Sequence, residues 1–281
     1  MTYFKNLQDF GYRQSKDVYV IAEIGLNHGG DVECGKRLIE SAVRAGVDAV
    51  KFQTYLTEKR APAGNTAMAE LLKKLELPFA AFAELKQCAG NLGVDFFSTA
   101  FDTESVDFLE SIECSMYKIA SFDVVNMELL RAVAATNKPV IMSVGMSSLE
   151  EIRSAYGALR DGTDKITLLH CISAYPLEES DAELAAVPRL RAEFDCLVGY
   201  SDHTPDIRVP LYAVAAGAQV IEKHYKMDEA FQCVDAPVSI TEAQMAKMVN
   251  EIRLLEKMFG QGEFGVRKVE RGTTVFRRPS A

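Results

Sequence analysis

The chain has 281 residues, of which 48% are hydrophobic and 25% are charged, a composition typical of soluble globular proteins. Forty acidic residues against 31 basic residues give a net charge of −9, which argues against nucleic acid as a partner, because nucleic-acid-binding modules normally carry a basic face. No apolar stretch is long enough to span a bilayer, no secretory signal precedes the first apolar run, and the six cysteines form no CxxC pair, so we expect a cytoplasmic protein without a membrane partner.

Eight short apolar runs recur along the chain and are rich in Val, Ile, Phe or Tyr. This composition predicts strands that are buried on both faces, as in a parallel sheet. The runs are residues 18–24, 48–53, 95–99, 116–120, 139–144, 166–171, 196–202 and 219–224.

Amphipathic segments that carry helix signals lie between these runs. They predict helices over 32–46, 66–93 with a break near Pro78, 103–112, 147–160 and 241–259. Gly46 is a C-cap candidate, and Thr103 is a weak start signal. Ser147, Ser148 and Thr241 are N-cap candidates.

Eight strands that alternate with helices over about 250 residues predict an α/β fold of the (β/α)₈ TIM-barrel type. A doubly wound open sheet is the alternative, but the eight repeats and the absence of a glycine fingerprint favour the barrel. We expect one catalytic domain over 1–281. Residues 1–17 would cap the barrel floor, 18–260 would form the barrel, and 261–281 would form a C-terminal tail.

Polar residues gather where the predicted strands end, which is the catalytic face of a TIM barrel. All four histidines are among them. The set is Glu23, Asn27, His28, Lys51, Gln53, Ser98, Thr99, Lys118, Ser121, Asp123, Ser143, His170, Ser173, Tyr175, Ser201, Asp202, His203, Glu222, Lys223 and His224. Lysines 51, 118 and 223, with hydroxyl groups beside them, predict a pocket for a phosphate or carboxylate.

His203 and His224 end adjacent strands, so they could meet at one divalent metal ion with positions left open for water and substrate. For His28 and His170, packing in the core is an equally good interpretation. A single Lys or Glu after a strand is more often a salt-bridged residue at the rim of the barrel than a catalyst. Each Lys and Glu in the set above could therefore be such a rim residue.

Eight motifs resemble the sialic acid synthase family, in the same order and with the same spacing across residues 18–260. They are AEIGLNHGGD (22–31), VKFQTY (50–55), FFSTAFD (96–102), YKIASFD (117–123), VIMSVGMSSLEEI (140–152), LLHCISAYP (168–176), GYSDHT (199–204) and IEKHYKMD (221–228). The family includes N-acetylneuraminate, pseudaminate and legionaminate synthases. The resemblance implies condensation of phosphoenolpyruvate with an N-acetylated amino sugar to a nine-carbon 2-keto acid, with release of phosphate.

The resemblance also implies roles for individual residues. Glu23, Lys51 and Lys118 would be catalytic, with Glu23 handling protons and positioning water. Lys51, Thr99, Lys118, Ser121, Ser143 and Ser201 would hold phosphoenolpyruvate. Gln53, Asp123, Ser173, Tyr175 and Asp235 would bind the sugar. His203 and His224 would bind a divalent cation, typically Mn²⁺, with Mg²⁺ or Co²⁺ as alternatives.

Several departures from the family leave the acceptor sugar open. Asp123 stands where the family usually has Glu, and segment 231–240 lacks the GPDH string of N-acetylneuraminate and legionaminate synthases and looks more like the pseudaminate branch. Relatives usually continue into an antifreeze-like domain at the position of FRRPSA (276–281), so either a separate chain could supply that domain, or the domain is dispensable because the acceptor sugar differs.

Two other functions remain alternatives. The chain could be a catalytically impaired barrel that binds phosphoenolpyruvate or a sugar as a partner subunit. It could also be a related 2-keto-3-deoxy sugar acid synthase. A homodimer is the default expectation for the assembly.

Overall fold

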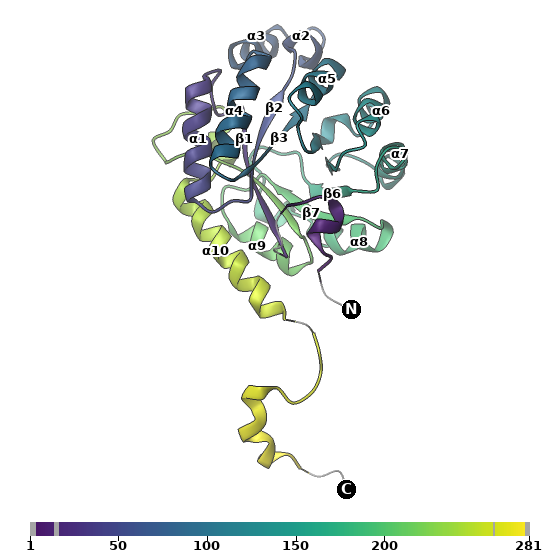
Figure 1. The fold of residues 1–281 in the computed structure, drawn as a ribbon, viewed down its shortest axis with the longest axis vertical. Helices are drawn as coiled ribbons and strands as arrows, with labels where there is room; N and C mark the ends of the chain where they lie inside the picture. Colours follow the sequence, from purple (N-terminus) through teal and green to yellow (C-terminus); the bar gives the residue numbers. More distant parts are fainter. Residues whose placement is uncertain (1–3, 14–16, 261, 279–281) are drawn as a thin grey trace.

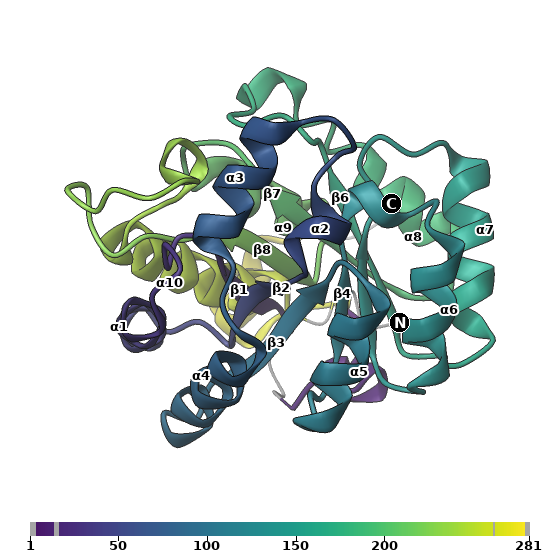
Figure 2. The ribbon, with the colours of Figure 1, turned by 90° about the horizontal axis from the view of Figure 1, so that it is seen from above.

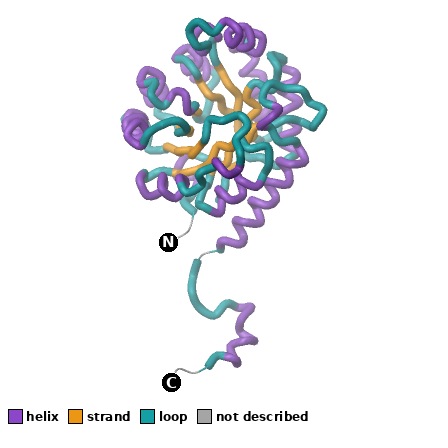
Figure 3. The backbone as a smooth tube through the Cα atoms, turned by 180° about the vertical axis from the view of Figure 1, so that it is seen from behind, coloured by secondary structure: helices purple, strands orange, loops and turns teal. Residues whose placement is uncertain are grey.

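The computed structural model describes residues 4–13, 17–260 and 262–278. Eight parallel strands form a closed barrel in chain order, and helices surround it (Figure 1, Figure 3). The strands are β1 (Tyr19–Gly25), β2 (Ala49–Thr54), β3 (Asp95–Ala100), β4 (Tyr117–Ile119), β5 (Val140–Ser143), β6 (Ile166–Cys171), β7 (Leu197–Asp202) and β8 (Val220–His224). Because β1 pairs with both β2 and β8, the predicted TIM barrel is confirmed and the open sheet is excluded.

Ten α-helices occur in the described part of the chain. They are α1 (Val32–Arg44), α2 (Thr57–Arg60), α3 (Thr66–Leu75), α4 (Phe79–Asn91), α5 (Thr103–Ser111), α6 (Met127–Ala135), α7 (Leu149–Arg160), α8 (Ala186–Glu193), α9 (Arg208–Ala215) and α10 (Glu242–Phe259). Short 3₁₀ helices are η1 (Leu7–Phe10), η2 (Ser121–Asp123), η3 (Glu179–Asp181), η4 (Ala236–Val238) and η5 (Lys268–Phe276). The predicted helices correspond to α1, α3, α4, α5, α7 and α10.

The helix ends follow the capping signals, and α5 has a cap that the sequence analysis did not name. Ser148 and Thr241 begin α7 and α10 with reciprocal capping boxes. Gly46 follows α1 with a φ of +84°, the left-handed conformation that ends many helices. α5 begins at Thr103 as expected, but Thr103 is its first helical residue and not its cap. Asp102 is the N-cap, because its carboxylate accepts the backbone N–H of Ser105 at 2.7 Å.

The segment before β1 lies at the N-terminal end of the barrel. The Tyr12 hydroxyl hydrogen-bonds to Thr167 of β6 at 2.7 Å, and the backbone N–H of Lys5 donates to Gln219, which precedes β8. These contacts place residues 4–13 beneath the strands. The parts of the expected cap and tail at 1–3, 14–16, 261 and 279–281 lie outside the described residues.

An ion pair between a partly buried arginine and a fully buried aspartate joins the last helix to the starts of the first two strands. Arg253 of α10 lies 2.6 Å from the carboxylate of Asp48 and donates to the carbonyl of Val18 at 2.7 Å. The same Asp48 oxygen accepts the backbone N–H of Val20. α10 therefore holds together the starts of β1 and β2.

The connection between β2 and α4, residues 55–78, carries α2 and α3 beside the C-terminal end of the barrel (Figure 2). Tyr55 and Leu72 of this connection form a small hydrophobic cluster with Leu26, which follows β1. The Tyr55 hydroxyl donates to the carbonyl of Leu72 at 2.9 Å, which fixes α3 against the end of β2.

Beyond α10, residues 262–278 project away from the barrel (Figure 1). Within the described ranges, no helix combines the length and the apolarity that crossing a membrane requires.

The close packing around β7 generates a stability prediction. A Cβ added at Gly199 would overlap the carbonyl of Val220 and a methyl of Leu169, so Gly199→Ala should lower the free energy of unfolding by about 3 kcal/mol or more. A Cβ at Gly157, exposed on α7, meets nothing within 4 Å, and Gly157→Ala should raise it by about 0.5–1 kcal/mol. Urea denaturation of both variants is the measurement, and a stable Gly199→Ala protein would contradict the packing described for β7.

Candidate active site

A cavity of about 320 Å³ opens at the C-terminal ends of the strands. All eight strands or the loops that follow them contribute to its lining. Twelve of the fourteen predicted site residues line it. These are Glu23, Lys51, Gln53, Thr99, Lys118, Ser121, Ser143, Tyr175, Ser201, His203, His224 and Asp235.

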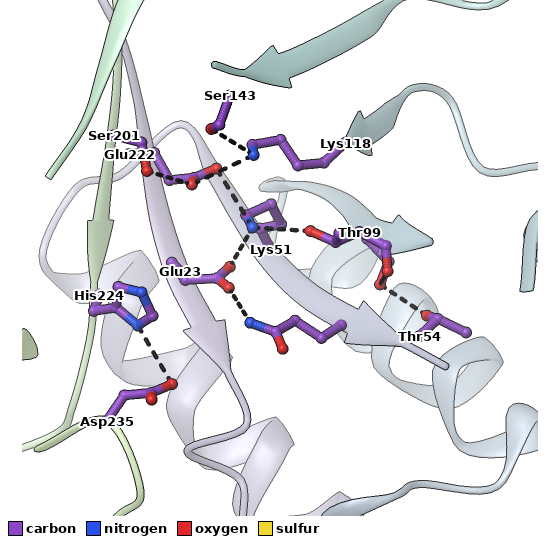
Figure 4. A network of polar contacts seen from close by, with 12 residues as sticks. Glu23, Lys51, Thr54, Thr99, Lys118, Ser143, Ser201, Glu222, His224 and Asp235 are labelled. Carbon is purple, nitrogen blue, oxygen red and sulfur yellow. Dashed lines mark hydrogen bonds and ion pairs between the residues drawn. The ribbon is translucent and has the colours of Figure 1, made fainter. Parts of the chain in front are cut away.

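Two buried lysines share one carboxylate inside the barrel (Figure 4). The Lys51 ammonium of β2 lies 3.4 Å from one oxygen of Glu222 of β8, and the Lys118 ammonium of β4 lies 3.8 Å from the other. Lys51 also donates to Thr99 at 3.0 Å, and Lys118 donates to Ser143 at 2.7 Å. Neutral hydroxyl groups thus surround two fixed cations, an arrangement suited to an oxyanion.

The buried lysines and carboxylates change one another's pKa values. Burial disfavours the Glu222 carboxylate, but Lys118, Lys51 and the Ser201 hydroxyl outweigh it and lower the pKa of Glu222 to about 2. Burial also opposes the charge on Lys51, whose pKa is nevertheless raised by Glu222 and Glu23. For Lys118 burial dominates, and its pKa is lowered.

Glu23 occupies the neighbouring position on β1. One carboxylate oxygen lies 2.9 Å from the Lys51 ammonium, and the other accepts the Gln53 side-chain amide at 2.8 Å. The side chain is only 2% exposed, yet it lines the cavity. Glu23 is therefore a fixed carboxylate beside the lysines, as a group that handles protons must be.

His203 and His224 face each other across the ends of β7 and β8, with ring centroids 5.4 Å apart. His203 Nδ1 lies 2.8 Å from the carbonyl of Ile172, so Nδ1 carries the proton and Nε2 presents its lone pair. Burial, then His224, lowers the pKa of His203 to about 3, which keeps the ring neutral. Burial also opposes protonation of His224, but Asp235, 3.5 Å from its Nδ1, raises its pKa.

This donor set fits a metal ion with only two protein ligands. A histidine ligand normally donates its second N–H to a carbonyl or carboxylate, and His203 does so. His224 Nδ1 is buried without a hydrogen-bond partner in the described chain. No group of three or more His, Cys, Asp or Glu residues is arranged to hold a metal within the described ranges.

Two predicted sugar-binding residues do not line the cavity. Asp123 lies on η2, where it accepts the Asn126 amide at 3.1 Å, and burial raises its pKa. The hydroxyl of Ser173 is buried without a hydrogen-bond partner among the described residues. Both follow strands as predicted, but their side chains lie outside the set that surrounds the cavity.

The expectation that Lys223 joins the other lysines was wrong. Successive side chains of a strand point to opposite faces, so Glu222 and His224 face the cavity and Lys223 faces away. Its ammonium lies 2.5 Å from the Asp202 carboxylate, and both side chains are fully buried. His28 and His170 also lie outside the lining. His28 stacks on Phe52, and His170 hydrogen-bonds to the carbonyl of Ala182 at 2.9 Å, so both pack as structural residues.

Two charged residues of the lining, Glu222 and Arg60, were given no role in the site by the sequence analysis. Glu222 was visible at the end of β8, and its spacing of two from His224 was the signal that it faces the cavity. Arg60 belongs to α2, outside the strand ends, and no motif singles it out. Its guanidinium reaches the cavity and donates to Gln53 at 2.7 Å.

The closed barrel and its polar cavity define a TIM-barrel protein whose site lies at the face that TIM-barrel enzymes use for catalysis. A model described as the NeuB family matches residues 38–264. The chain belongs to the NeuB family, and the resemblance drawn from its motifs is confirmed.

Individual relatives are similar over most of the barrel. Uncharacterized protein MJ1065 of Methanocaldococcus jannaschii is 44% identical over 251 residues, 89% of this chain and 74% of the relative. N,N'-diacetyllegionaminic acid synthase of Legionella pneumophila is 38% identical over 268 residues, 89% of this chain and 75% of the relative. N-acetylneuraminic acid synthetase of Leptospira borgpetersenii, solved in complex with citrate, has a TM-score of 0.89 at 38% identity and covers 92% of this chain and 91% of its own.

The buried carboxylate generates a pH prediction. The folded-state pKa of Glu222 lies below its ordinary value of 4.5, so the unfolded chain binds more protons between these two pH values. The stability from Glu222 is therefore complete above about pH 5 and disappears as the pH falls through about 2, a loss of about 3 kcal/mol. Glu222→Gln should be less stable than wild type at pH 7, and the difference should shrink toward pH 2. Urea denaturation across this range is the measurement, and parallel curves would contradict the described network.

Proposed function

We propose that the chain condenses phosphoenolpyruvate with an N-acetylated amino sugar, giving a nine-carbon 2-keto sugar acid of the sialic acid type and inorganic phosphate. The observation that carries the proposal is the pair of buried lysines, 51 and 118, ringed by hydroxyl groups inside a NeuB-family barrel. Relatives named as synthases of N,N'-diacetyllegionaminic acid and N-acetylneuraminic acid support the class of product.

Phosphoenolpyruvate is the ligand that the lysines would hold. Its phosphate and carboxylate carry the charge that two ammonium groups can neutralise, and Thr99, Ser143 and Ser201 supply further donors. Glu222 and Glu23 are the counter-ions of the two lysines before the substrate arrives, so neither ammonium group is buried without an opposite charge nearby.

A divalent cation, for which Mn²⁺ is our first choice, would be held by His203 and His224. When bound, it would supply Lewis-acid polarisation of a carbonyl oxygen. Tyr175 packs on the His203 ring, with centroids 4.0 Å apart, and so restricts how that ring can turn. Asp235 orients His224.

The bond changes follow from the two substrates. C3 of phosphoenolpyruvate attacks the aldehyde carbon of the open-chain sugar, and positive charge develops at C2. Water adds at C2, one of its protons is taken up, and the aldehyde oxygen becomes a hydroxyl. The bond between C2 and the bridging oxygen of the hemiketal phosphate then breaks, and the C2 hydroxyl gives its proton to the departing phosphate, which leaves the ketone.

Glu23 is the group that would orient the water and accept its proton. Gln53 and Lys51 hold its two oxygens in place. Lys51 and Lys118 would stabilise the phosphate from binding to departure, so that much of the rate would come from alignment of the reactants and from fixed charges.

A sugar panel tests the proposal directly. Phosphate release from phosphoenolpyruvate should require an N-acetylated amino sugar and a divalent cation, and mass spectrometry should find the condensed product. Phosphoenolpyruvate binding without phosphate release for any sugar would instead indicate a binding subunit. The panel should include precursors of N-acetylneuraminate, legionaminate and pseudaminate.

His203→Ala should abolish metal-dependent product formation, by at least about 100-fold, because only one imidazole would remain to hold the ion. Phosphoenolpyruvate binding, measured by calorimetry, should persist. Full activity in this variant would overturn the metal assignment.

Lys118→Met should raise the KM for phosphoenolpyruvate by about 10- to 100-fold, the value of one charge-assisted hydrogen bond. The KM for the sugar should change much less. Steady-state kinetics with each substrate varied in turn provide the measurement. Equal effects on both KM values would show that Lys118 does not bind the phosphate or carboxylate.

A further inference from the structure

Arg60 is held in the wall of the cavity by aromatic rings. Its guanidinium carbon lies 4.5 Å from the centroid of Tyr55 and 4.0 Å from that of Phe101. Nη2 donates to the Gln53 side-chain oxygen at 2.7 Å. The planar group is therefore fixed in position and orientation before any ligand arrives.

One edge of this guanidinium has no partner. Nη1 is buried and makes no hydrogen bond to any residue that the structure describes. The attraction from Asp235, Glu23 and Asp123 acts only at longer range. A buried donor without a partner is costly, so a ligand that supplies an oxygen here gains the full value of the hydrogen bond.

Several of the residues around Arg60 are apolar. Tyr55 belongs to the cluster of Leu26 and Leu72, against which Phe101 packs. Leu26 and Phe101 also line the cavity, as does Met68 of α3. This is unlike the surroundings of Lys51 and Lys118, where hydroxyl groups supply several donors.

One charged donor in an apolar wall fits an acylamino group. Its carbonyl oxygen accepts the N–H, and its methyl group packs against the aliphatic and aromatic side chains. A phosphate or carboxylate would require several donors at this place. We propose that Arg60 binds the carbonyl of an acylamino substituent on the acceptor sugar and thereby selects acylated sugars, an inference that rests on the proposed function.

The link to Glu23 supports this placement. Arg60 donates to the oxygen of Gln53, and the nitrogen of Gln53 donates to Glu23. The acylamino group would thus lie on the side of the cavity where Glu23 acts. Arg60 also fixes which way the Gln53 amide faces.

The experiment measures sugar binding by calorimetry without phosphoenolpyruvate, so that no turnover occurs. The probes are a 2,4-diacetamido hexose, N-acetylmannosamine and mannose, which carry two, one and no acylamino groups. Arg60→Met should weaken binding of the acylated sugar that wild type prefers by about 10- to 100-fold and leave mannose within about 2-fold. Arg60→Lys, which keeps the charge but loses the planar fork, should lose most of the same preference.

Lys59→Met is the matched control. Lys59 precedes Arg60 on α2, but its side chain is exposed and pairs with Glu104, so all three affinities should match wild type. Thermal melting verifies that each variant folds, and if Arg60→Met does not fold, Arg60→Lys decides the result.

The outcomes separate this inference from the proposed function. The role of Arg60 would be overturned if Arg60→Met lost affinity equally for acylated and non-acylated sugars, or lost none. It would also be overturned if wild type did not bind acylated sugars. Selective loss in the binding assay, together with no phosphate release by wild type with the full panel, would support Arg60 and overturn the synthase proposal instead.

Discussion

A cluster of ionised side chains inside the barrel is the constraint on which the site depends. Glu23, Lys51, Lys118 and Glu222 are each between 2% and 5% exposed, and isolated charges in such a place would be costly. The two carboxylates and two ammonium groups compensate one another, and Thr99, Ser143 and Ser201 add hydrogen bonds to Lys51, Lys118 and Glu222 in that order. The fold can therefore keep cations in its interior, where fixed charges act on a ligand far more strongly than they would in water.

Much of the architecture could be predicted, because strands buried on both faces are continuous apolar runs and their ends converge in a closed barrel. Glu23, Lys51 and His203 were found in this way. The wrong placement of Lys223 came from treating adjacent residues as equivalent, although a strand turns every second side chain away. α8 and α9 were missed because each contains a proline and lacks a side-chain cap, and the residues of α9 are almost all apolar.

What sequence patterns could not supply is the contact between side chains from distant elements. Glu222 and Lys118 are 104 positions apart, and their meeting depends on the closure of the barrel. Arg60 is positioned by the connection between β2 and α4. Tyr55 and Leu72 of this connection pack with Leu26 in a small cluster that is separate from the main core. The position of Arg60 could not be derived from any strand. The strands of the barrel thus position the lysines and histidines, while the connection between β2 and α4 positions Arg60 in another part of the cavity wall.

The pairing of β1 with β8 has a consequence for the order in which the protein folds. The last strand supplies Glu222 and His224, and α10 then ties Arg253 to Asp48 near the start of β2. Contacts between residues so far apart form late, because the entropy of closing a long loop must be overcome first. On the ribosome, the two lysines emerge well before Glu222, the carboxylate that pairs with both of them. A nascent barrel that lacks β8 therefore has Glu23 but not Glu222 beside its lysines, and it lacks the second imidazole.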